Sequence, residues 1–248
     1  MRLVTLNTWK GDGAYHRRLI AMAEGLTAED PDIVLLQECL RAPEARLDTA
    51  ACLAETLGMD HIAWHGRRKL REVEGREIDC TSGVAILSRL PILASRTIML
   101  PSNPQDGERA ALSARIGAME CVSLHLTHLI DDEVLRRAQL ETILGRIQIG
   151  PALLGGDFNA TPDAALFDGL PLTDCRILAG VPAAPTCEGR CIDHVMAAGW
   201  SPQVDDVRLV LSETTDGIAP SDHAGIAIDF GPSRPRCRAS HPSDGGFR

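Results

Sequence analysis

Polar side chains that can bind a cation or move a proton stand repeatedly at the ends of short apolar runs. Asn7 ends RLVTLN, Glu38 follows IVLLQ, and His128 ends VSLHLTH. The later members of the set are Asp157, Asn159, Asp193, Asp222 and His223. A strand holds its last residues rigidly at the edge of a sheet, where polar groups converge on a ligand without burying unpaired charge. The spacing therefore predicts one site that combines cation binding with acid–base chemistry.

The oxygen donors in this set suit a hard divalent cation. Mg²⁺ and Mn²⁺ prefer one or two carboxylates together with water and phosphate oxygens. Asn7 and Glu38 offer such oxygens, and Asp222 is a further candidate, either directly or through a water molecule. Considered alone, Glu38 would be a solvated acid after a strand.

Asp157 and Asn159 are two residues apart in GGDFNA. In an extended backbone both side chains face the same side. A carboxylate and an amide placed in this way can orient a water molecule, bind a phosphate oxygen or hold a second metal. The alternative is a turn closed by the Asp side chain, which is common after Gly-Gly.

Apolar periodicity predicts the elements that position these residues. Residues 15–26 and 131–147 show helical spacing, and Asp131 or Asp132 would cap the second helix. The predicted strands are 2–7, 32–37, 83–88, 111–116, 120–128, 151–156, 191–197 and 224–230. Two strand-rich halves with helices between them predict two packed sheets covered by helices, an α/β fold. Along the strand 120–128, His125 would face the opposite side from His128 and have a structural role.

Two charged stretches predict loops, 65–79 and 101–109. For the first, a solvated face is the favoured interpretation. The alternative is a basic loop that faces a substrate through Arg67, Arg68, Lys69 and Arg71.

Length and composition indicate a globular protein with one domain. The 248 residues are 44% apolar and contain no run near the ~20 apolar residues that span a bilayer. We expect a domain over 1–230 and a disordered tail over 231–248, which is rich in Pro, Ser, Gly and Arg. No secretory signal opens the sequence, so the expected location is the cytoplasm, with a monomer as the default.

The charge is unevenly distributed. The net charge is −9, but four Arg and one Asp make the tail basic and leave about −12 on residues 1–230. Such a body does not attract polyanions by its overall field, so a phosphate-bearing substrate would need a local basic patch or bound cations. Only 3% of residues are aromatic, which leaves few surfaces for base stacking. Trp9, Trp64 and Trp200 are expected in the core, with contacts to substrate as the alternative.

The eight cysteines are scattered and mostly beside apolar residues, which indicates small buried side chains rather than disulfides. Only Cys187 and Cys191 are close enough in sequence to suggest zinc, and no second Cys or His pair stands at the spacing of a zinc finger.

Seven motifs together resemble the endonuclease/exonuclease/phosphatase superfamily, which includes nucleases like deoxyribonuclease I, neutral sphingomyelinases and inositol polyphosphate 5-phosphatases. They are TLNTW (5–9), LLQE (35–38), GVAILSR (83–89), THL (127–129), GGDFNATPD (155–163), IDHV (192–195) and SDH (221–223). Their order matches nearly the whole chain, and the combination is far more specific than any one tripeptide. The resemblance implies a four-layer α/β/β/α sandwich with its site at one end of the two sheets.

The resemblance also implies roles. Glu38 would be the principal metal ligand, and His223 would be the C-terminal family histidine, oriented by Asp193. His128 resembles the second family histidine, which contacts phosphate or protonates the leaving oxygen. Arg109 resembles a basic position that touches phosphate, whereas Arg136 and Gln139 fit a helix surface.

Three departures bear on the comparison with the family. A glutamate before GVAILSR would partner His128, and Glu77 is the nearest candidate, with Glu74 and Asp79 competing. An aromatic residue is common where this chain has His194. Abasic-site endonucleases place a tyrosine where this chain has His128, which disfavours that branch.

The sequence therefore predicts a phosphodiesterase that depends on Mg²⁺ or Mn²⁺. A nuclease is the first choice of substrate class, with a sphingomyelinase-like or other small-molecule phosphodiesterase or phosphatase as the alternative. A catalytically silent binding module is a third interpretation, which the complete polar set disfavours.

Overall fold

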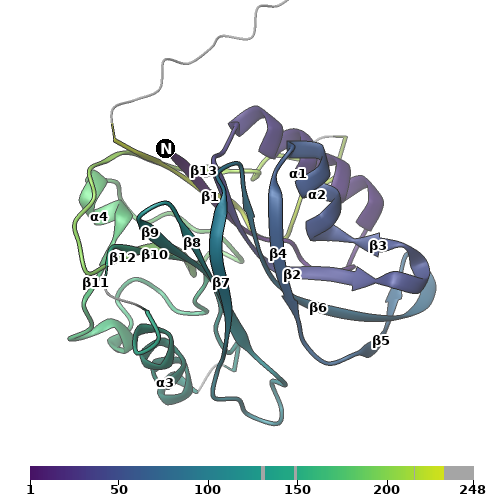
Figure 1. Ribbon diagram of the computed structural model, residues 1–248. Helices are drawn as coiled ribbons and strands as arrows, with labels where there is room; N and C mark the ends of the chain where they lie inside the picture. Colours follow the sequence, from purple (N-terminus) through teal and green to yellow (C-terminus); the bar gives the residue numbers. More distant parts are fainter. Residues whose placement is uncertain (130–131, 148–149, 215, 232–248) are drawn as a thin grey trace, which may run out of the picture.

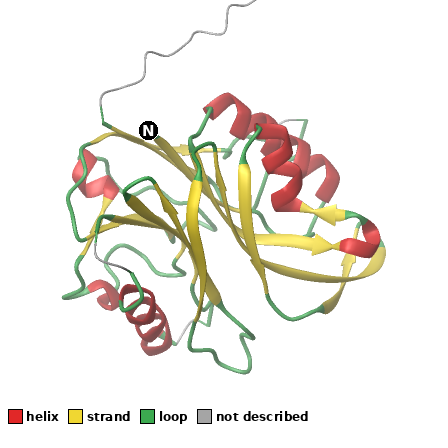
Figure 2. Cartoon of the chain, in the orientation of Figure 1, coloured by secondary structure: helices red, strands yellow, loops and turns green. Residues whose placement is uncertain are grey.

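The structure of the protein is a computed structural model that describes residues 1–129, 132–147, 150–214 and 216–231. Two β-sheets pack face to face, and helices lie on their outer faces (Figures 1 and 2). The predicted α/β sandwich is confirmed. Except for Gly231, the expected tail lies outside the described residues. None of the helices in the described part is long and apolar enough to cross a membrane.

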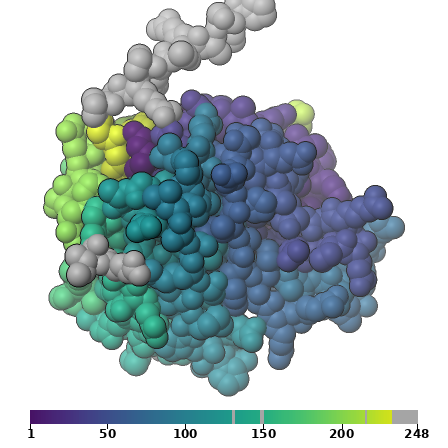
Figure 3. Space-filling view, viewed as in Figure 1, coloured from purple at the N-terminus to yellow at the C-terminus, as the bar shows by residue number. Residues whose placement is uncertain are grey.

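The first sheet has the strand order β13-β14-β1-β2-β6-β4, with β3 beside β2 and β5 beside β6. Its central strands β1 and β2 run parallel, and their neighbours β14 and β6 are antiparallel to them. The bounds are β1 (Arg2–Asn7), β2 (Ile33–Ala42), β3 (Leu47–Asp48), β4 (Asp60–His65), β5 (Lys69–Val73), β6 (Arg76–Ser88), β13 (Val204–Val210) and β14 (Gly225–Phe230). In Figure 3 the yellow residues of the C-terminal strand lie beside the purple N-terminus.

The second sheet has the order β11-β12-β10-β9-β8-β7. Here too a parallel pair, β9 and β10, occupies the interior. The bounds are β7 (Ile92–Met99), β8 (Ala110–Ile116), β9 (Met119–His125), β10 (Ala152–Asp157), β11 (Leu172–Asp174) and β12 (Asp193–Ala198). The helices are α1 (Tyr15–Glu29), α2 (Thr49–Leu57), α3 (Glu133–Leu144) and α4 (Cys175–Ala179), with short 3₁₀ turns at Pro43–Ala45 and Ala165–Phe167.

The central strands are apolar on both faces because each face has its own core. In β1 and β2, Leu3 and Leu35 point into the core between the sheets, whereas Val4 and Leu36 face α1 and α2. A third core lies between α3 and the second sheet. Burial on both faces explains why these strands are continuous apolar runs rather than alternating ones.

Several predicted boundaries differ from the structure. The segment predicted as a loop over 65–79 contains β5 and the start of β6, which form an antiparallel hairpin. The prediction failed because charges occur on both faces of this hairpin, so no apolar alternation marks it. Helix α2 was also not predicted. The loop 101–109 is confirmed.

Strand β2 does not end at Glu38 but continues to Ala42 through an irregularity. The pairing of β2 with β6 shifts register between Leu36 and Cys39, and Glu38 has a φ of 57°. A bulge of this kind re-aims one side chain without ending the strand. The left-handed backbone at Glu38 therefore turns its carboxylate out of the regular alternation.

Arg18 fastens two loops that follow the strands. Its side chain is among the largest that are fully buried, and its guanidinium donates five hydrogen bonds of 2.9–3.2 Å to backbone carbonyls. The acceptors are Thr8, Trp9, Lys10, Asp12 and Pro220. The guanidinium also lies 4.8 Å from the centre of the Trp9 ring. One side chain of α1 thus holds the loop after β1 against the segment before β14.

A second buried cluster supports β12 from behind. The carboxylate of Asp174 accepts a hydrogen bond from the backbone of Arg176 at 2.8 Å and pairs with its guanidinium at 2.6 Å. His194, which is fully buried, lies 3.3 Å from Asp174 and donates from Nε2 to the carbonyl of Ala160 at 2.7 Å. Burial opposes the charged form of Asp174, but hydrogen bonds from His194 and Arg176 outweigh it and lower its pKa to about 2.

The depressed pKa of Asp174 predicts a specific pH dependence of stability. Its contribution is complete above the unfolded-state pKa of 3.8 and is lost as the pH falls through about 2. We expect Asp174→Asn to lower the free energy of unfolding by about 2 kcal/mol at pH 7. Urea unfolding between pH 3 and 7 should show a steeper acid decline for the wild type than for the variant. Asp60→Asn, at an exposed position, is the control, and parallel wild-type and Asp174→Asn profiles would contradict the assignment.

Replacement of Arg18 tests the loop fastening. Arg18→Met leaves five carbonyls without this donor, and a buried unsatisfied group costs about 1–3 kcal/mol. We expect a loss of stability on the order of 3 kcal/mol or more, measured by thermal and urea unfolding. Arg17→Met, at an exposed position of the same helix, is the matched control. Equal losses in the two variants would show that the five hydrogen bonds contribute no more than a surface contact.

Candidate active site

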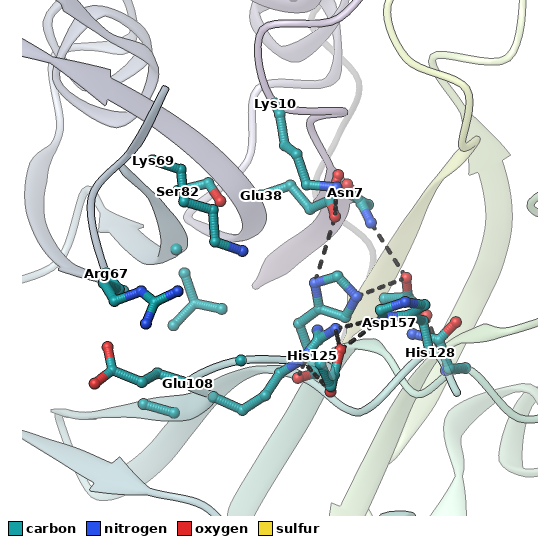
Figure 4. Close-up of a pocket in the computed structure, with 18 of the residues that line it drawn as sticks. Asn7, Lys10, Glu38, Arg67, Lys69, Ser82, Glu108, His125, His128 and Asp157 are labelled. Atoms are coloured by element: carbon teal, nitrogen blue, oxygen red, sulfur yellow. Dashed lines mark hydrogen bonds and ion pairs between the residues drawn. The ribbon is translucent and has the colours of Figure 1, made fainter. Parts of the chain in front are cut away.

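A cleft of about 760 Å³ opens where the parallel strands of both sheets end. Asn7 ends β1, His125 ends β9 and Asp157 ends β10, and all three line the cleft. Figure 4 shows these side chains pointing toward one another from the two sheets. Carboxyl ends of parallel strands are the usual place for ligands in such sheets, because several rigid ends meet there.

Asp157 is at the centre of the hydrogen-bonded groups. Asn7 donates its amide to Asp157 Oδ2 at 3.2 Å, and His125 Nε2 lies 3.4 Å from the same oxygen. His223 Nε2 lies 3.9 Å from it. Asp157 is only 2% exposed, and burial, together with the charge of Asp193, raises its pKa to about 7.

His223 and Asp193 form the predicted pair. His223 Nδ1 donates to Asp193 Oδ2 at 2.8 Å, which leaves Nε2 directed toward Asp157. Burial alone would lower the pKa of His223, but the hydrogen bond and charge of Asp193, with Asp157 and Asp222, raise it to about 9. The pair therefore presents an oriented, positively charged imidazole to the cleft.

The backbone places these groups at one level. Asp157 is directly opposite His125 on β9 and Asp193 on β12 in the strand register. Gly156 precedes Asp157 with a φ of 150°, and a Cβ there would come within 2.0 Å of the carbonyl oxygen of Leu124. The second glycine of GGDFNA is thus required by the close approach of β10 to β9.

Glu38 and Asp222 complete an acidic wall. Glu38 Oε1 pairs with Lys10 Nζ at 2.6 Å and lies 4.0 Å from His125 Nδ1. Burial raises the pKa of Asp222, and the negative charge of Glu38 adds to the shift. Ser221 donates to the carbonyl of Asn7 at 2.6 Å, which fixes the segment bearing Asp222 to β1.

These residues fit a hard divalent cation. Glu38, Asp222 and Asn7 bring carboxylate and amide oxygens to the wall of one cleft, and Asp222 is a carboxylate whose ionisation this wall disfavours. A cation bound among these oxygens would offset that penalty. Oxygen donors of this type are those preferred by Mg²⁺ and Mn²⁺.

Asn159 takes part in a turn closed by Asp157 and also lines the cleft, so both interpretations of GGDFNA apply to it. Its backbone N–H donates to Asp157 Oδ1 at 2.8 Å, which is the expected turn. Its side chain nevertheless lines the cleft and donates to the carbonyl of Leu126 at 3.1 Å. Asn159 has a φ of 51°, so it does not continue the extended backbone of β10 as we predicted.

The partner of His128 is Asp106, not Glu77. His128 Nδ1 lies 2.7 Å from Asp106 Oδ1 and 2.9 Å from Arg109 Nη2. Arg109, predicted as a phosphate contact, lines the cleft and pairs with Asp106 at 2.5 Å. Glu77 lies in the β5–β6 hairpin opposite Glu72. The competing Glu74 and Asp79 pair instead with His16 and Arg68.

His125 lines the cleft, contrary to the structural role predicted for it. The prediction extended strand alternation to residue 128, but β9 ends at His125. His125 lines the cleft from the end of the strand, and the loop beyond it brings His128 to the same cleft. The side chain of His125, beside Asp157, is 12% exposed, and that of His128 is 59% exposed. Arg136 and Gln139, predicted on a helix surface, are buried and bind this loop. Gln139 Oε1 accepts from the N–H of Thr127 at 2.9 Å, and Arg136 donates to the carbonyl of Leu129 at 2.7 Å.

Sequence reasoning missed Lys10 and Asp106. Lys10 follows the TLNTW motif with a φ of 44°, which periodicity does not reveal. Asp106 lies in the loop 101–109, where its place three residues before Arg109 was the available signal. Trp9 and Trp64 are half-buried and line the cleft, whereas Trp200 donates to the carbonyl of Ala152 at 3.2 Å.

The two cysteines suspected of binding zinc have different surroundings. Cys187 lies near Asp222 and His223, with possible ligand atoms within 4.8 Å of one another. Burial raises the pKa of its thiol to about 12, so the thiol remains protonated. Cys191 accepts a hydrogen bond from Arg176.

Comparison with known proteins agrees with this geometry. The family model "Endonuclease/Exonuclease/phosphatase family" matches residues 4–223. No curated protein matches the chain. Among solved structures, an endonuclease/exonuclease/phosphatase family protein from Leptotrichia buccalis has a TM-score of 0.73 at 18% identity, covering 93% of this chain and 99% of that one.

Two further structures share the fold. D. rerio TDP2 complexed with single-strand DNA product has a TM-score of 0.71 at 18% identity, covering 94% of this chain and 99% of that one. The human Nocturnin catalytic domain with bound sulfate has a TM-score of 0.69 at 20% identity, covering 93% of each chain. The family match spans most of the chain and includes the cleft from Asn7 to His223. The protein therefore belongs to the endonuclease/exonuclease/phosphatase family, whose enzymes hydrolyse phosphoester bonds with a divalent metal ion.

Proposed function

We propose that this protein is a phosphodiesterase that depends on Mg²⁺ or Mn²⁺ and cleaves nucleic acid. The observation that carries the proposal is that Asn7, Glu38 and Asp222 meet Asp157 and His223 in one cleft. Oxygen donors on one wall and an oriented imidazole on the other are the two requirements of metal-assisted phosphoester hydrolysis.

Glu38, Asn7 and Asp222 would hold the ion, which supplies neutralisation of the negative charge on the phosphate. Asp157 and Asn159 position the attacking water, and its proton passes to the carboxylate of Asp157. The positively charged His223 stabilises negative charge that develops on the phosphate. Asp193 keeps the ring of His223 in one orientation through Nδ1. A water attacking in line with the leaving oxygen would invert the configuration at phosphorus.

His128 serves the leaving oxygen in this proposal. Its Nδ1 is occupied by Asp106 and Arg109, and its side chain is largely exposed, so Nε2 is available to donate a proton. His125 is assigned a positioning role, because its side chain lies between Glu38 and Asp157, 4.0 Å from the first carboxylate and 3.4 Å from the second.

Loss of Glu38 tests the metal-dependent activity. We expect Glu38→Gln to lower turnover about 10³-fold, which corresponds to about 4 kcal/mol of barrier, and to weaken the dependence on Mg²⁺ and Mn²⁺. The substrates are plasmid DNA, single-stranded DNA, RNA, bis-p-nitrophenyl phosphate and sphingomyelin. Glu44→Gln, at an exposed position, is the control.

Unchanged turnover and metal dependence in Glu38→Gln would refute the assignment of the site. If the wild type cleaves only sphingomyelin or the small diester, the protein is not a nuclease but a phosphodiesterase for small substrates. The salt dependence separates the classes, since binding of a polyanion weakens steeply with salt.

Substitutions of His125 and of His128 test the roles that we assign to these two histidines. We expect His125→Asn to lower kcat about 10²-fold or more, because the two acidic residues lose the side chain between them, and His128→Asn to lower kcat about tenfold to 10²-fold. His61→Asn, on the exposed face of β4, should leave kcat unchanged. Steady-state kinetics, with thermal unfolding as a check of folding, make the comparison. Retained activity in His125→Asn would return that residue to a purely structural role.

A further inference from the structure

A second wall of the same cleft is basic. Lys69 and Arg71 of β5 line the cleft together with Arg67, just before the strand, and with the loop 101–109. Figure 4 shows Arg67 and Lys69 on the side of the cleft away from Asp157 and His128. The proposed hydrolytic roles use none of these three cations.

Strand geometry explains which side chains of the hairpin face the cleft. Lys69 and Arg71 are two residues apart on β5, so they share one face of the strand. Leu70, between them, is 67% exposed and is absent from the cleft lining. Arg68 pairs outside the cleft with Asp79 at 2.8 Å. Arg68 is therefore paired outside the cleft, whereas Arg67, Lys69 and Arg71 line it.

The charges of this wall are available to a ligand. Within the described residues, no ion pair or hydrogen bond joins Arg67, Lys69 or Arg71 to an acidic side chain. Asp106, on the adjoining loop, is already engaged by Arg109 and His128. Asp12 and Glu108 also line the cleft and partly offset the positive charge.

The loop leaves room beside these cations. Gly107 has a φ of 84°, and a Cβ there would lie 3.8 Å from Lys69 Nζ. The amine of Lys69 therefore lies beside a residue that has no side chain. Trp64, half-buried, lines the cleft next to Gly66. The cleft volume of about 760 Å³ exceeds what one phosphate group fills and falls in the range of sites for larger small-molecule ligands.

We propose that Arg67, Lys69 and Arg71 form a subsite for a second phosphate group, so that the preferred substrate is a phosphodiester with another phosphate beside the scissile one. This inference rests on the proposed phosphodiesterase activity. The acidic wall needs a cation to accept one phosphate, whereas the β5 wall attracts a second phosphate directly, by Coulomb attraction and hydrogen bonds.

Paired chromogenic substrates test the subsite. The first pair is thymidine 5′-(p-nitrophenyl phosphate) with and without a 3′-phosphate, and the second is thymidine 3′-(p-nitrophenyl phosphate) with and without a 5′-phosphate. The two pairs place the extra phosphate on opposite sides of the scissile group. We expect at least a tenfold higher kcat/KM for the bisphosphorylated member of one pair.

Lys69→Gln/Arg71→Gln should abolish that preference and change kcat/KM of the matching monophosphorylated substrate less than twofold. The matched control is Arg68→Gln/Arg76→Gln, which removes the same charge from the same hairpin but outside the cleft lining. Preference in neither pair, or equal effects of the two double variants, would overturn the subsite.

A binding measurement separates failure of the subsite from failure of the activity. By calorimetry with Mg²⁺, which the acidic wall needs to accept a phosphate, thymidine 3′,5′-bisphosphate should bind at least tenfold more tightly than either monophosphate, and Lys69→Gln/Arg71→Gln should remove the difference. Tighter binding without hydrolysis of any diester would refute the proposed activity alone. Hydrolysis with equal binding of mono- and bisphosphate would refute the subsite alone.

A single-stranded oligonucleotide distinguishes the two sources of the second phosphate, a polymer or a small molecule. For an oligonucleotide, removal of two phosphate contacts should reduce the slope of log(kcat/KM) against log salt by about 1.4. An unchanged slope, with the bisphosphate preference intact in the wild type, assigns the subsite to a small bisphosphorylated substrate.

Discussion

The burial of Asp157 is the constraint on which the site depends. An ionised carboxylate inside a protein is stable only where donors or cations surround it. Here the surroundings come from both sheets, since Asn7 belongs to the first and His125 to the second. Burial raises the pKa of Asp157, and neighbouring donors offset part of that rise, so the sheets must keep their relative position for the carboxylate to ionise near pH 7. The buried side chains behind the cleft hold them there.

Three polar side chains behind the cleft join the two sheets. Gln37 donates to Ser123 across the interface at 3.1 Å, and Ser123 donates to the carbonyl of Leu36 at 2.9 Å. Thr5 lies on the same network through its contact with Gln37. Directional hydrogen bonds in a core of aliphatic side chains fix one lateral arrangement, whereas apolar packing alone tolerates small slips. Together with the hydrogen bonds of Arg18, this network holds the two sheets in one arrangement and so fixes the strand ends that line the cleft.

The fold and most of the site could be predicted from the sequence because motifs and strand patterns coincide. Apolar runs marked the central strands, and acids, amides and imidazoles marked their ends. Prediction failed wherever the backbone departs from regular alternation. The bulge at Glu38, the end of β9 at His125 and the turn at Asn159 each change which way a side chain points. The partner of His128 came from a loop, where Asp106 has no periodic signal.

The β5 hairpin differs from the rest of the cleft in how freely it can vary. Among the described strands, β5 pairs only with β6, and its one buried residue, Val73, packs in a small cluster with Tyr15 and Leu40, apart from the cores between the layers. A change of one residue in its length would exchange the inward and outward faces of β5. Leu70 and Glu72 would then replace Lys69 and Arg71 at the cleft, while the residues proposed to hold the metal and the water stayed in place. A hairpin of this kind would allow substrate preference to change by insertion or deletion, independently of the residues assigned to the reaction.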